Sequence, residues 1–213
     1  ILFESQADML VYGMGEKPLT ELCQMLRRGI PFHSLTNIPQ TCVLRDKEEK
    51  YATNKRWQTI TLASHEECLT DKKKYATICL SNKKHHAENF RYIEEESNSI
   101  HAAKLIQPIE DKLIIVNPPY PPMTTDEIDA VYDLPFTRLP HPKYKDKEIP
   151  AYNMIRHSIT LHRGCFGGCA FCTISAHQGK FIVSRSKESI LKEVKAITEL
   201  PDFKGYLSDL GGP

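Results

Sequence analysis

The sequence predicts an α/β fold made of two α/β pieces and an irregular α+β insert between them. Residues 8–28 combine a short apolar strand, a glycine turn and a helix, which is half of a βαβ unit. Residues 157–213 combine a strand, a loop, a helix and a second strand, and this order implies a parallel sheet. One strand and one helix cannot form an open sheet alone. We therefore expect the first piece to end a doubly wound α/β domain that begins upstream of Ile1.

Changes in composition divide the chain into four predicted segments. Residues 1–40 are expected to be the end of this doubly wound, Rossmann-like domain. Residues 41–134 are expected to be an insert or connecting subdomain. Residues 135–156 are expected to be a linker, because their proline density excludes a long helix and a central strand. Residues 157–213 are the fourth segment, with the order strand, loop, helix and strand described above.

Local signals predict the elements within these segments. Ser64 followed by Glu67 is a capping box, which predicts a helix that could run to about residue 90. Thr124 or Thr125 is expected to cap a short helix, and Ser186 a longer one. Apolar runs predict strands at 8–12, 41–45, 58–62, 112–117, 158–161 and 205–210. The two N-terminal helices are expected to bury the stripes Leu19, Leu22, Cys23, Leu26 and Cys68, Tyr75, Ile78, Cys79.

Composition excludes several classes of partner. With 28 Lys+Arg against 27 Asp+Glu, the net charge of +1 gives no electrostatic reason to expect nucleic acid. No apolar run approaches the roughly 20 residues that a membrane span needs, so no membrane partner is expected. Seven cysteines, four of them scattered, do not form a disulfide framework. Together these features favour a reducing, cytoplasmic location.

The remaining three cysteines form the candidate site. Their spacing is Cys165-x3-Cys169-x2-Cys172, and thiolates suit zinc, copper(I) or iron–sulfur clusters. A [4Fe–4S] cluster usually takes four cysteines. Three would leave one iron open for a small molecule that chelates through an amine and a carboxylate. Glycines at 164, 167 and 168 would let the loop curl tightly, and we expect Phe166 and Phe171 to exclude water from one side.

Two other interpretations remain open at this point. A structural zinc site could recruit His162 or His177 as a fourth ligand. Such a structural zinc module, or a structural iron–sulfur module, would bind metal without catalysis. Alternatively, the three cysteines could be buried structural residues. The scattered cysteines are not expected to be ligands in any of these cases: Cys23, Cys42, Cys68 and Cys79.

The motifs resemble a known family across nearly the whole chain. The stretch from Cys165 to Cys172 resembles the cysteine signature of the radical S-adenosylmethionine (SAM) superfamily, with Phe171 as its aromatic residue. The final Gly211-Gly212-Pro213 resembles the glycine motif of the second barrel strand. Stretches beginning at Pro118, Asp133 and Ser175 are similar to the YgiQ-type branch, whose activity is unassigned.

The resemblance implies a cofactor set and a reaction. The three cysteines would hold a [4Fe–4S] cluster, SAM would chelate the fourth iron, and reductive cleavage would give a 5′-deoxyadenosyl radical. Phe171 would contact the adenine, and Gly211 and Gly212 would receive the methionyl amino group. Pro213 stands where many relatives carry glutamate. An electron donor such as flavodoxin or ferredoxin would be a partner.

The resemblance also implies an architecture. Residues 8–28 look like the end of a cobalamin-binding-like domain, and residues 157–213 like the first two strands of a partial β/α radical SAM barrel. The chain is expected to be an internal fragment that is inactive alone, with substrate contacts on later strands. No catalytic residue beyond the cofactor site and no substrate can be named.

Overall fold

The computed structural model describes residues 1–80, 102–135, 137–145 and 147–212. They form two compact units. The first unit comprises residues 1–121 and 167–180, and the second comprises residues 122–166 and 181–213.

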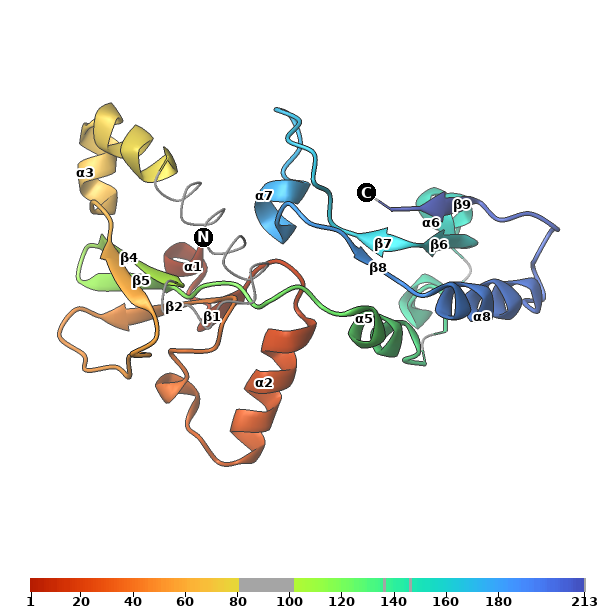
Figure 1. Cartoon of the computed structure of the whole chain (residues 1–213), viewed down its shortest axis with the longest axis horizontal. Coiled ribbons are helices and arrows are strands. Elements are labelled where there is room, and N and C mark those ends of the chain that lie inside the picture. The colour runs from red at the N-terminus through yellow and green to blue at the C-terminus, as the bar shows by residue number, and fades with distance from the viewer. Residues whose placement is uncertain (81–101, 136, 146, 213) are drawn as a thin grey trace. The chain divides into compact units, whose positions relative to one another are not determined.

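The first unit contains a five-stranded mixed sheet with the order β1-β2-β5-β4-β3 (Figure 1). Its neighbours are antiparallel except for the parallel pair β3–β4. Val43, Ile106 and Ile115 form the buried core of the sheet. The strands are β1 (Met9–Val11), β2 (Thr41–Asp46), β3 (Gln58–Thr61), β4 (Ala103–Ile109) and β5 (Lys112–Val116).

This topology differs from the predicted domain division. β1 pairs antiparallel with β2, and Leu10 lies opposite Cys42. Residues on both sides of the predicted boundary at 40 and 41 therefore share one sheet. The prediction of a mixed α/β chain is confirmed, whereas the described residues show β1 at the edge of a mainly antiparallel sheet rather than at the end of a parallel one.

The first unit also contains α1 (Leu2–Ser5), α2 (Glu16–Arg27), the 3₁₀ helix η1 (Phe32–Ser34), α3 (His65–Thr70) and α7 (Ile174–Gln178). The Ser64–Glu67 capping box is confirmed at the start of α3. The predicted long helix is interrupted at Asp71, which is extended (φ −125°, ψ 102°), and residues 72–80 are helical again. The part of that prediction beyond residue 80 lies outside the described residues.

Both predicted apolar stripes are largely wrong. On α2, Leu19, Cys23 and Leu26 are exposed. In the second stripe Ile78 is buried, but Tyr75 is exposed. Cys68 is half-buried and Cys79 exposed. Helical spacing predicted the helices correctly but not what covers them.

A buried lysine lies within the same sheet. Lys104 on β4 is 1% exposed, and its ammonium donates to Asn37 Oδ1 at 2.6 Å. Its Nζ also lies 5.9 Å from the ring centroid of Tyr51 and 5.4 Å from that of Trp57. Burial lowers the pKa of Lys104 to about 8, because the charged form loses its hydration. The lysine thus fixes the irregular segment before β3 against the sheet.

The second unit confirms the predicted βαβ order. β6 (Ser158–Thr160) pairs parallel with β9 (Asp209–Gly211), and β7 (His162–Arg163) pairs antiparallel with β8 (Val183–Ser184). Its helices are α5 (Thr125–Tyr132), the 3₁₀ helix η2 (Pro142–Tyr144), α6 (Pro150–Ile155) and α8 (Lys187–Thr198).

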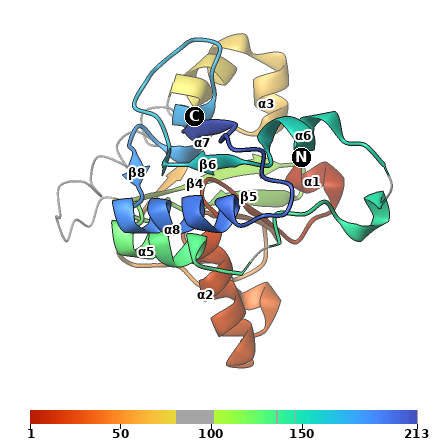
Figure 2. The same ribbon diagram turned by 90° about the vertical axis from the view of Figure 1, so that its right-hand side faces the viewer.

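Side-chain caps begin two of these helices as predicted. Thr124 forms a capping box with Glu127 at the start of α5. The Ser186 hydroxyl accepts from Ser189 N at the start of α8. Ser186 N also donates to Asp129 Oδ1 at 3.1 Å, so the N-terminus of α8 lies beside α5 (Figure 2). None of the helices in the described part of the chain is long and apolar enough to cross a lipid bilayer.

Candidate metal and cofactor site

The cysteine loop follows a strand that changes partners. Thr160 at the end of β6 lies opposite Gly211 of β9. Leu161 N donates to Gly211 O at 2.7 Å, whereas Leu161 O accepts from Arg185 N at 3.0 Å. The loop therefore begins at the carboxyl end of β6. Gly211 lies at the carboxyl end of β9, the neighbouring parallel strand. This is the edge at which open α/β sheets bind ligands.

Gly164 starts the loop and has to be glycine. Its φ is +83°, and a Cβ at this position would lie 2.3 Å from Phe181 O. The backbone of residues 164 and 181 can approach this closely only when no side chain separates them. The glycine thus joins the two ends of the cysteine segment.

Gly164→Ala is expected to open this junction. Gly205→Ala is the matched control, because Gly205 has a similar φ of +87° but no heavy atom within 4 Å of the Cβ position. The control should cost only the left-handed backbone strain, about 1–2 kcal/mol, whereas Gly164→Ala should cost more. The rate of proteolytic cleavage within residues 164–182 measures the difference. Equal rates in the two variants would contradict the close approach.

The three cysteines offer a suitable donor set. None of the seven cysteines forms a disulfide, and Cys165 and Cys172 are half-buried while Cys169 is exposed. Cys172 N donates to Cys169 O at 3.1 Å, which closes a turn between these two predicted ligand positions. Cys165 belongs to the second unit and the other two to the first. Over the described ranges, no group of three or more His, Cys, Asp or Glu side chains is arranged to hold a metal ion. The chemistry of three reduced thiols in one loop nevertheless fits a cluster.

The predicted aromatic shield is absent from this structure. Phe166 is 73% exposed and Phe171 is 92% exposed. Neither ring therefore excludes water from the cysteines. The adenine contact predicted for Phe171 stays a prediction.

The glycine motif lies beside a histidine. Gly211 ends β9, and Gly212 follows it against the imidazole of His162. Pro213 lies outside the described residues. His177 is exposed on α7, and its backbone oxygen is 3.3 Å from the position of a Cβ on Gly13. The close approach and the positive φ of +67° explain the glycine at position 13 in the first turn.

Sequence reasoning missed a charged network next to β6, the strand that precedes the cysteine loop. Arg185 is 6% exposed, and its guanidinium donates to Thr160 O at 2.9 Å, to the Ser189 hydroxyl and to Glu193. Arg185 Cζ also lies 3.9 Å from the ring centroid of Tyr132. Arg163, two residues before the first cysteine, donates to the Tyr132 hydroxyl at 3.3 Å. These residues fix the strand that carries the cysteine loop.

The motif around Tyr120, which contributed to the family resemblance, has a structural role in the first unit. Tyr120 N donates to Gln40 Oε1 at 3.3 Å, and its hydroxyl donates to Glu21 on α2. Burial raises the pKa of Glu21. Gln40 Nε2 in turn donates to Tyr12 O at 2.7 Å. The stretch therefore connects α2, through Glu21, with Gln40 and the residue after β1.

The scattered cysteines differ in environment. Burial raises the pKa of Cys42 to about 12, so this thiol stays protonated at neutral pH. Cys23 and Cys79 are exposed and Cys68 is half-buried. The prediction that none of the four is a ligand remains a prediction.

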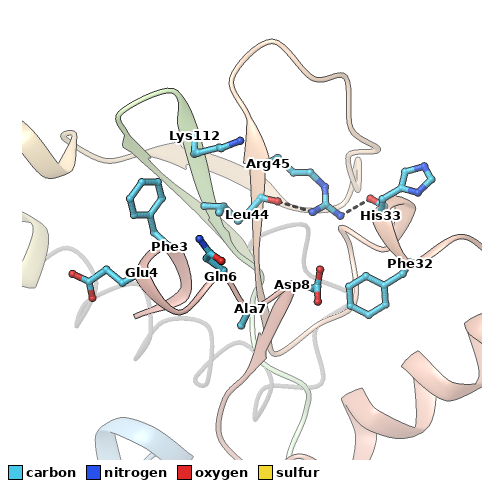
Figure 3. A pocket seen from close by; sticks show the side chains of 10 residues that line it. All are labelled: Phe3, Glu4, Gln6, Ala7, Asp8, Phe32, His33, Leu44, Arg45 and Lys112. Carbon is cyan, nitrogen blue, oxygen red and sulfur yellow. Dashed lines mark hydrogen bonds between the residues drawn. The ribbon is translucent and has the colours of Figure 1, made fainter.

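A recess of about 590 Å³ in the first unit is a weaker candidate (Figure 3). Its cations are already engaged by protein groups. Arg45 donates from Nη1 to Leu44 O at 2.6 Å and from Nη2 to His33 O, and Lys112 pairs with Asp46. The cysteine loop therefore remains the better-supported site.

The chain is similar to UPF0313 proteins of several organisms. It is 57% identical to a UPF0313 protein of Bacteroides thetaiotaomicron, 56% to one of Porphyromonas gingivalis and 44% to one of Methanocella arvoryzae. Each match covers 100% of this chain but only 34%, 32% and 33% of the relative, respectively. The chain thus spans about a third of the length of these relatives. No solved structure matches.

A family model described as radical SAM N-terminal matches residues 1–158. The match ends before Cys165, so it does not itself include the cysteine loop. It nevertheless covers most of the chain, and it agrees with the superfamily resemblance of the motifs that follow. The chain belongs to the radical SAM N-terminal family.

Proposed function

We propose that the full-length protein is a radical SAM enzyme whose cofactors bind at Cys165, Cys169, Cys172 and the glycines 211 and 212 at the end of β9. The observation that carries the proposal is the three-cysteine spacing at the carboxyl edge of the β6–β9 pair. When bound, a [4Fe–4S] cluster with SAM on its open iron would supply a 5′-deoxyadenosyl radical for hydrogen abstraction. Membership of the radical SAM N-terminal family supports this proposal.

The residues of this chain would have separate tasks. The three thiolates would each bind one iron, and the backbone of Gly211 and Gly212 would receive the methionyl amino group. Phe171 would stack on the adenine, a contact worth about 0.5–1.5 kcal/mol. Such stacking would also cover its exposed ring. An electron donor such as flavodoxin or ferredoxin would reduce the cluster in the cytoplasm.

Anaerobic reconstitution of the full-length protein tests the proposal. We expect about four irons and four sulfides per chain, and slow cleavage of SAM to 5′-deoxyadenosine under dithionite, measured by liquid chromatography. A structural zinc or iron–sulfur module would instead leave SAM intact. Tightly bound zinc with no uptake of iron, or intact SAM in a fully reconstituted and reduced protein, would overturn the enzyme proposal.

A further inference from the structure

The imidazole of His162 occupies the space beside Gly212. A Cβ on Gly212 would stand 2.4 Å from Nε2, 2.5 Å from Cε1 and 2.7 Å from Cδ2 of His162. Carbon atoms that are not bonded pack at about 3.5–4.0 Å. Three ring atoms therefore fill the volume that any other residue at position 212 would need, and the ring packs directly on the glycine backbone.

Strand pairing brings the two residues together. Thr160 and Gly211 form the last pair of the β6–β9 ladder, so His162 and Gly212 lie just beyond it on the two chains. His162 is itself fixed, because it pairs with Ser184 in the β7–β8 ladder. The imidazole thus projects from a strand that is paired on both sides of Leu161.

We propose that His162 is a positioning residue for SAM, whose ring holds Gly211 and Gly212 in the conformation that receives the methionyl group. This inference rests on the proposed function. The role is steric and needs no proton transfer and no metal bond. It also gives a reason for the glycine at position 212, because a Cβ there would require the ring to move.

A double-mutant cycle in the reconstituted full-length protein tests whether His162 and Gly212 are energetically coupled. SAM affinity is measured by equilibrium dialysis for the wild type, Gly212→Ala, His162→Ala and the double variant, with iron content measured in each. We expect roughly tenfold weaker binding in each single variant, within the range found for contacting residues. The double variant should bind SAM more tightly than Gly212→Ala, because the space beside residue 212 is then vacant.

Three further measurements distinguish a steric role of the His162 ring from other causes of weaker SAM binding. His162→Phe should retain most of the SAM affinity if the ring acts by its shape. The pair His162→Ala with Gly205→Ala should be additive, since no heavy atom lies within 4 Å of the Cβ position at Gly205. Thermal unfolding of the same variants without SAM measures the coupling directly, so the contact can be tested even if SAM does not bind.

These measurements distinguish a failure of the proposed function from a failure of the role of His162. A wild type that holds its cluster but does not bind SAM would overturn the proposed function. A wild type that binds SAM, with a double variant no better than Gly212→Ala, would overturn the role of His162 alone. Wild-type affinity in His162→Ala, or loss of affinity in His162→Phe, would overturn it as well.

Discussion

Replacing Cys169 by alanine in the full-length protein is expected to remove the iron–sulfur cluster and, with it, all cleavage of SAM. In the proposed site each of the three thiolates would hold one iron, and the fourth iron would have to stay open for SAM. Two thiolates leave two irons without protein ligands. Iron content after anaerobic reconstitution should therefore fall from about four per chain to near zero. Metal and sulfide analysis, with the absorbance of the cluster, measures this.

Cys23→Ala is the matched control. Cys23 and Cys169 are both exposed thiols of the first unit, but Cys23 lies on α2. The control should retain its full iron content. His177→Ala should retain it too, whereas a zinc site with three cysteines and this histidine would lose metal. A full cluster in Cys169→Ala, or loss of iron in Cys23→Ala, would contradict the assignment of ligands.

Much of the second unit could be predicted because its signals are local. Ser186 accepts from Ser189 N, and Thr124 from Glu127 N, as capping residues do at fixed spacing. The parallel pairing of β6 with β9 follows from the order strand, helix, strand. Each of these features depends on a few neighbouring residues or on a general rule of connection.

The first unit was predicted less well because its organisation depends on distant residues. β1 has three residues, too few for a pattern that distinguishes a parallel from an antiparallel partner, and its pairing with β2 spans about thirty positions. β4 was not predicted as a strand, since Lys104, Gln107 and Pro108 interrupt its apolar pattern. Lys104 is nevertheless buried against two aromatic rings that come from another part of the chain.

The candidate site shows the same contrast between local sequence signals and contacts of distant residues. The spacing of the three cysteines is a property of the sequence alone. The contact between His162 and Gly212 depends on which residues pair across β6 and β9, fifty positions apart. Arg185 gave no sequence signal either, because a buried arginine is recognised only when its partners are known.

Glu193→Ala is expected to destabilise the second unit by about 3–5 kcal/mol, the usual cost of breaking a buried ion pair. The Glu193 carboxylate accepts a hydrogen bond from Arg185 and pairs with Arg138. The side chains of Glu193, Arg185 and Arg138 are 12%, 1% and 16% exposed, respectively. The variant leaves the Arg185 guanidinium in a buried position without the carboxylate that it contacts. Hydrogen exchange of the α8 amides in the full-length protein measures the loss.

Lys192→Ala provides the control on the same helix. Lys192 pairs with Asp133, and their side chains are 69% and 51% exposed. Exposed pairs contribute about 0–1 kcal/mol, so this variant should leave the exchange of α8 nearly unchanged. Equal exchange in the two variants would show that the buried network adds little. A large effect confined to Glu193→Ala would instead show that α8 holds Arg185 in place, and through it Thr160 O at the end of β6.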